Sequence, residues 1–147
     1  MIEAIAIQIE NIFNNCTIYT NHIEQNFKKN SFFIRIIETL EKPYLAKRFK
    51  IFNKIEIAYS PEKTEDENKK LNEISQKLFE NMKKLKYENG YINSENMACE
   101  IKDGRLLFFL EYNYYIFRFD KTTKMQKLSF KGDTKWKKMK NILKRNF

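Results

Sequence analysis

The residue types that perform acid–base, nucleophilic or metal chemistry are few in this chain and widely spaced. There is one histidine, His22, and there are two cysteines, Cys16 and Cys99. A single histidine in a polar stretch is typical of a surface residue, and the cysteines fit no metal-ligand spacing. Three scattered glycines cannot build a phosphate-binding loop. The sequence therefore predicts no enzyme, with no catalytic residue, no cofactor and no metal site.

One pair of residues has the spacing of a known catalytic motif. Glu100 and Lys102 are two apart, so they point to the same face of a strand. Nucleases of the restriction-enzyme type use such a pair to bind a metal ion and hold a hydroxide. That chemistry also needs an upstream Asp on a neighbouring strand, whereas Asp66 lies in the acidic first turn of a predicted helix. We interpret the pair as a solvated strand face and keep a metal-dependent nuclease as a third hypothesis.

The charge of the chain is concentrated at its C-terminus. The 147 residues include 28 Lys and Arg and 19 Asp and Glu, which gives a net charge of +9. Residues 121–147 contain 10 of these basic side chains and a single acidic one, Asp133, so they account for the whole excess. We therefore predict a neutral domain over residues 1–120 and a basic extension over residues 121–147. A generally basic nucleic-acid-binding domain would show a different distribution.

The composition predicts a folded chain that crosses no membrane. Hydrophobic residues make up 42% of the chain and aromatic residues 15%, which is enough to bury a core. No stretch reaches the length of an apolar membrane span, and Glu3 and Glu10 interrupt the apolar N-terminus, which is unlike a signal peptide. We expect an intracellular protein whose Cys16 and Cys99 are reduced and buried.

Hydrophobic spacing predicts a helix followed by three strands in the first half of the chain. Apolar residues from Ile2 to Phe13 recur at spacings of three and four, as in an amphipathic helix. The run 17–20 is β-branched and aromatic and predicts a short strand. Strands over 32–40 and 48–60 should pair antiparallel, with Lys42-Pro43 as the break between them. In the first of these two strands the alternate residues assigned to the core are Phe32, Ile34, Ile36, Glu38 and Leu40.

The second half predicts a helix and a long hairpin. The helix should cover 64–85, with Thr64 and Glu67 as a capping box. Asp103-Gly104 predicts a tight turn between strands over 91–102 and 105–120, and the aromatic second strand suits a central position with both faces covered. The fold class is therefore α+β: an antiparallel or mixed sheet of about four to five strands with two helices on one face.

The C-terminal extension adds a predicted basic amphipathic helix. Its apolar residues share one helical face and are Trp136, Met139, Ile142 and Leu143. Basic residues surround that face, among them Lys137, Lys138 and Lys140. Such a helix can dock on a protein partner, contact a polyanion or bind a membrane surface. The apolar face favours docking on a partner, with these apolar and basic residues as the binding surface.

Several spaced elements of residues 1–120 resemble one family. They are Ile18-Tyr19-Thr20 followed by Glu24-Gln25, Phe32-Phe33-Ile34, Arg48, the strand from Ile55 to Tyr59 ending in Ser60-Pro61, Asn68, and Asp103-Gly104-Arg105-Leu106-Leu107-Phe108-Phe109 running into Tyr112-Asn113-Tyr114. In this order they are similar to the tail terminator proteins of phages and prophages of Gram-positive bacteria. These are short proteins of contractile tails and of tail-like bacteriocins.

The resemblance implies a structural role without catalysis. Tail terminators of this kind close the head-proximal end of the tail tube as a ring, commonly a hexamer. They end polymerisation of tube and sheath and present a surface to the head–tail connector. The resemblance thus implies a homo-oligomer in the virion tail, assembled in the cytoplasm of the bacterial host, with tube, sheath and connector proteins as partners and no membrane.

The resemblance does not extend to the basic extension. We expect this segment to pack across a neighbouring subunit or onto the tube or sheath, with Trp136 as the anchor. The alternative is that it contacts packaged DNA or the connector, so a nucleic-acid-binding module remains the second hypothesis for the protein.

Overall fold

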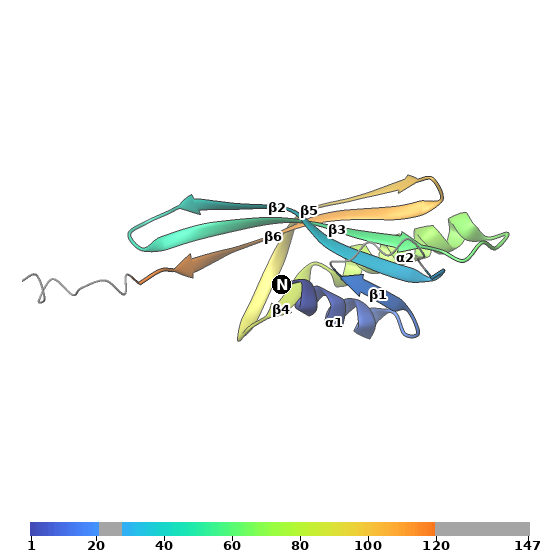
Figure 1. Ribbon diagram of the computed structural model, residues 1–147, viewed down its shortest axis with the longest axis horizontal. Coiled ribbons are helices and arrows are strands. Elements are labelled where there is room, and N and C mark those ends of the chain that lie inside the picture. The colour runs from blue at the N-terminus through green and yellow to red at the C-terminus, as the bar shows by residue number, and fades with distance from the viewer. Residues whose placement is uncertain (21–27, 120–147) are drawn as a thin grey trace, which may run out of the picture. The chain divides into compact units, whose positions relative to one another are not determined.

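A computed structural model of the chain describes residues 1–20 and 28–119, and Met1–Phe117 form one compact unit. Figure 1 shows the elements. In chain order they are α1 (Ile2–Ile12), β1 (Thr17–Thr20), β2 (Ser31–Pro43), β3 (Arg48–Ser60), α2 (Glu67–Asn81), β4 (Lys84–Tyr87), β5 (Gly90–Lys102) and β6 (Arg105–Phe117). The predicted α+β class is confirmed. The predicted C-terminal helix and its residues lie outside the described residues, as does His22.

In the described part of the chain the sheet contains six strands rather than about four to five, in the order β1-β2-β3-β6-β5-β4. It is mixed, because β1 runs parallel to β2 while every other neighbouring pair is antiparallel. The strand that the prediction missed is β4, in which Leu85 is buried and pairs with Ile92. Leu85 continues the apolar spacing of α2, so the sequence pattern alone extends the helix over it. Pairing with β5 places Leu85 in a strand instead of the helix.

The second helix is shorter than predicted, and its predicted capping box is wrong. α2 begins at Glu67 with Asp66 as N-cap, and no side chain makes a capping hydrogen bond. The Glu67 carboxylate instead lies beside the β5–β6 turn, 3.2 Å from where a Cβ on Gly104 would be. The buried stripe does follow the predicted spacing and includes Leu71, Ile74 and Leu78. The Glu67 side chain therefore lies beside the turn rather than over the N-terminus of its own helix.

The core lies between one face of the sheet and both helices, which Figure 1 shows on the same side of the sheet. α1 contributes Ile5 and Ile9 to it. The sheet contributes every second residue of three neighbouring strands: Phe32 and Ile34 of β2, Ile55, Ile57 and Tyr59 of β3, and Leu106, Phe108, Leu110 and Tyr112 of β6. Among the residues that the structure describes, no helix is long and apolar enough to span a membrane.

A β-bulge corrects the predicted core face of β2. The pairing with β3 shifts register between Ile36 and Glu38, which places one extra residue in β2. One extra residue moves all later side chains to the opposite face. Phe32 and Ile34 therefore face the core as predicted, whereas Glu38 and Leu40 do not. Ile36 is 36% exposed, and β2 continues through Lys42-Pro43, where a break was predicted.

The predicted β5–β6 hairpin is confirmed, and β6 lies between β3 and β5. Asp103 and Gly104 both have positive φ, 52° and 71°, as the two central residues of a type I′ turn require. The prediction that both faces of β6 are covered is wrong. Residues facing the helices are buried, but Leu107 and Phe109 on the opposite face are half-exposed.

Candidate interaction surfaces

The structure places Glu100 and Lys102 on the face of β5 that points away from the helices. Both side chains are exposed. Within the described residues, no group of three or more His, Cys, Asp and Glu side chains could hold a metal ion.

The two cysteines are free, as predicted, and they are half-buried rather than buried. The Cys16 thiol donates a hydrogen bond of 3.2 Å to the carbonyl of Phe13. Burial raises the pKa of Cys16, which keeps it in the thiol form. Cys99 packs against the core. Neither residue has the environment of an activated nucleophile.

Three strands continue as an arm beyond the part of the sheet that the helices cover. β1 pairs with β2 only as far as Ile34, and β5 pairs with β6 only as far as Tyr112. Beyond these positions only β2, β3 and β6 remain, and Figure 1 shows them extending past α1 and α2. We call residues 38–52 and 113–117 the arm. Among the described residues, its strands have no fourth neighbour in the sheet and no helix packs against either face.

One face of the arm alternates aromatic and basic side chains. Cross-strand pairing places Lys42 opposite Lys50 and Lys50 opposite Tyr115. The Lys50 ammonium lies 4.9 Å from the ring centre of Phe52, and the Arg48 guanidinium lies 4.9 Å from that of Phe117. Cations held over rings in this way make weakly attractive contacts. Because these aromatic and basic side chains gather on one face, this aromatic–basic face of the arm is a candidate interaction surface.

The arm also exposes large apolar side chains. The most exposed are Leu40 at 43%, Tyr44 at 55%, Leu45 at 65%, Tyr115 at 50% and Phe117 at 56%. Tyr44, in the loop between β2 and β3, contacts Tyr115 with 5.1 Å between ring centres and the rings tilted by 57°. A cluster of exposed apolar residues on a projecting element marks a binding surface more often than a chance exposure.

Ion pairs fix the geometry where the arm leaves the body of the sheet. Arg35 donates two hydrogen bonds, of 2.9 and 2.6 Å, to one oxygen of Glu56, which is 7% exposed. Lys54 and Glu38 form a second pair at 3.2 Å, with both side chains about half exposed. The buried Glu56 carboxylate gains most from its partner, because a buried charge is costly unless it is paired.

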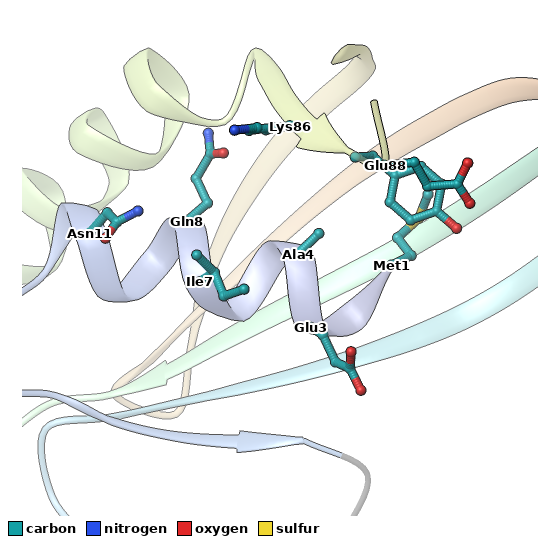
Figure 2. A pocket seen from close by; sticks show the side chains of 9 residues that line it. Met1, Glu3, Ala4, Ile7, Gln8, Asn11, Lys86 and Glu88 are labelled. Carbon is teal, nitrogen blue, oxygen red and sulfur yellow. The ribbon is translucent and has the colours of Figure 1, made fainter. Parts of the chain in front are cut away.

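A second candidate surface lies along α1. Ile7 of this helix is 60% exposed. Two shallow grooves flank it, and both are lined by Glu3 and Ile7. The first groove, of about 500 Å³, lies between α1 and β4, and Figure 2 shows Ala4 and Gln8 pointing towards β4 while Glu3 points away from it. The second, of about 420 Å³, lies between α1 and β1 and includes Glu10.

Hydrogen bonds hold α1 in place beside β4. The Gln8 amide donates to two backbone carbonyls, that of Asn81 at 2.6 Å and that of Lys84 at 2.9 Å. Tyr112 ties the same region to the sheet, because its hydroxyl donates to the carbonyl of Met82 at 2.7 Å. The grooves along α1 are therefore bounded by elements that hold fixed positions.

The sequence suggests the long aromatic strand and the loop over 41–47 as candidate contacts of a ring, and parts of both lie in the arm, but it gives no signal for α1. The bulge after Ile36 reverses the faces of the arm, so alternation along β2 does not show which side chains share a surface. For α1, the apolar stripe predicts the buried side correctly, but Ile7 lies off that stripe and gives no signal of its own. The residues predicted to bind a partner, from Trp136 to Leu143, lie outside the described residues.

Comparison with protein families gives one match. The sequence model of a family described as "Phage tail terminator protein" matches residues 1–124. A search of curated proteins finds no match to the chain. The matched residues include all of the described sheet, both helices, the arm and the grooves along α1.

Proposed function

The chain belongs to the phage tail terminator family, and on that premise we propose that it closes the head-proximal end of a tail tube as a ring. In this role it ends the polymerisation of tube and sheath and joins the tail to the head connector. The family match over residues 1–124 is the observation that carries the proposal. A structural role in tail assembly, as a component of the virion tail, follows from the family itself.

A closed ring of identical subunits at the end of the tube would prevent further tube and sheath subunits from adding. Closed rings form through heterologous contacts, in which one surface of a subunit meets a different surface of the next. The arm and the α1 grooves support this proposal, because they are two distinct surfaces on one subunit. We propose a hexameric ring, in a contractile tail or a tail-like bacteriocin, with tube, sheath and connector proteins as its partners.

The basic extension has a separate proposed role. The extension docks on a neighbouring subunit or on the tube or sheath, through Trp136, Met139, Ile142 and Leu143, with Lys137, Lys138 and Lys140 beside them. A second function is favoured by the charge distribution, since all of the net charge of +9 lies in residues 121–147. In that alternative the extension contacts DNA passing through the ring. Salt dependence distinguishes the two, because phosphate contacts weaken steeply as salt rises whereas apolar docking does not.

Electron microscopy of particles made with and without this chain tests the proposed function. With the chain present, labelled protein should lie as a ring at the head end of each tail. Without it, tails should be overlong or lack heads. Normal tails attached to heads in its absence would refute the proposal, as would label located anywhere else on the particle.

A further inference from the structure

We propose that the arm of one copy docks along α1 of the next copy, with its aromatic–basic face over Ile7 and between the acidic side chains of the helix. The inference rests on the proposed ring and names the two surfaces that would close it. Both surfaces lie within residues that the structure describes.

The arm and α1 belong to different parts of the same unit. Ile5 and Ile9 fix α1 in the core beneath the covered half of the sheet. The arm consists of the strand segments that extend past this half (Figure 1). An arm built into a continuous three-stranded sheet cannot fold back onto the helix of its own chain. A contact between these two surfaces must therefore join two copies.

The charges of the arm and of the groove between α1 and β1 are complementary. The end of the arm, residues 41–50, contains Lys42, Lys47, Arg48 and Lys50 against a single acidic residue, Glu41. α1 contains Glu3 and Glu10 and no basic side chain. Both glutamates are exposed, and both line the groove between α1 and β1. Complementary charges of this kind steer two surfaces together and fix their register.

The two surfaces also match in apolar character and in length. Each exposes large apolar groups: Ile7 on the helix, and Tyr44, Leu45 and Tyr115 on the arm. Residues 38–43 of β2 span about 20 Å at 3.3 Å per strand residue. The 11 residues of α1 span about 16 Å at 1.5 Å per helical residue. The arm can therefore lie along the whole helix.

A contact between arm and helix has a direction. Each copy offers its arm to one neighbour and its α1 to another, which is the heterologous arrangement that closes into rings. An arm-to-arm contact would instead stop at a dimer. Because the two sides of an arm-to-helix contact differ, the charge of each side can be reversed in a separate variant to test the inference.

The experiment uses two full-length variants. The arm variant carries Lys42→Glu and Arg48→Glu, and the helix variant carries Glu3→Lys and Glu10→Lys. All four positions are exposed, so both variants should fold, which circular dichroism and urea unfolding verify. Sedimentation velocity then measures self-association of each variant alone and of an equimolar mixture. We expect each variant alone to associate about tenfold more weakly than wild type, and the mixture to recover, because alternating copies restore opposite charges at every contact.

The control is a third variant with the exposed α2 substitutions Lys69→Glu and Glu80→Lys, which should associate like wild type. The inference is overturned if the helix variant associates normally, if the mixture fails to recover, or if the wild-type chain stays monomeric. Loss of single-stranded DNA binding by the arm variant, with unchanged self-association, would overturn it in favour of a nucleic-acid surface. In each of these cases a normal ring at the tail end would leave the proposed function standing.

Discussion

At the scale of single residues, buried tyrosines make the stability of the domain sensitive to alkali. Tyr59 is 1% exposed, and its hydroxyl donates a hydrogen bond of 2.6 Å to Oδ1 of Asn30. Burial, together with the nearby Glu62 carboxylate, raises the pKa of Tyr59 to about 12. The folded state therefore keeps the phenolic proton over a pH range in which the unfolded chain loses it.

This shift predicts how the free energy of unfolding changes with pH. Below pH 10 the contribution of Tyr59 is fully present, and between pH 10 and 12 it falls by about 1.4 kcal/mol per pH unit. We expect the Tyr59→Phe variant to lose less stability than wild type between pH 9 and 11, as measured by urea unfolding. Tyr91→Phe, at a residue that is 64% exposed, should follow wild type. Equal losses in wild type and Tyr59→Phe would contradict this account.

At the scale of elements, the two ends of β5 offer a pair of glycines for comparison. Gly104 has a positive φ of 71°, and a Cβ there would lie 3.2 Å from the Glu67 carboxylate. A Cβ on Gly90, at the start of β5, would meet nothing within 4 Å. The two positions therefore separate the cost of a left-handed backbone conformation from the general effect of replacing a glycine.

We expect Gly104→Ala to destabilise the domain by about 1 kcal/mol, because alanine adopts a positive φ only at a cost. Gly90→Ala should change the stability by less than about 0.5 kcal/mol. Thermal or urea unfolding of the two variants measures the difference. If Gly90→Ala proved the more damaging of the two, the assigned turn geometry would be wrong.

The elements also show how much of the fold the sequence could predict. Local signals located α1, β1, β3 and the β5–β6 hairpin, because periodic apolar residues and turn residues act within a few positions. The bulge after Ile36 and the strand β4 were missed, since both depend on pairing with another strand. The arm follows from the bulge and from where β1 and β5 stop pairing. The pairing register of the strands decides which side chains share the surface of the arm. No pattern of neighbouring residues in this chain indicates that register.

At the scale of the whole molecule, the two parts of the chain should be separable. All of the described elements lie before residue 118, so a variant ending at Asp120 should keep the urea midpoint of the domain. If the basic extension docks within the tail, the same variant should fail to complete tails when it is supplied in place of the full chain. A scrambled extension of equal charge serves as the control. Completion of tails by the shortened chain would show that the extension is dispensable for assembly.

The family places the chain in the tail, and the proposal that it terminates the tail makes one further prediction about tail length. Without a terminator, polymerisation of the tube has no stop at the head-proximal end. The most direct measurement is therefore the distribution of tail lengths in electron micrographs of particles made with and without this chain. The account predicts a single narrow length with the chain, and a broad distribution that extends to much longer tubes without it. A narrow distribution at the same length in both preparations would contradict the account.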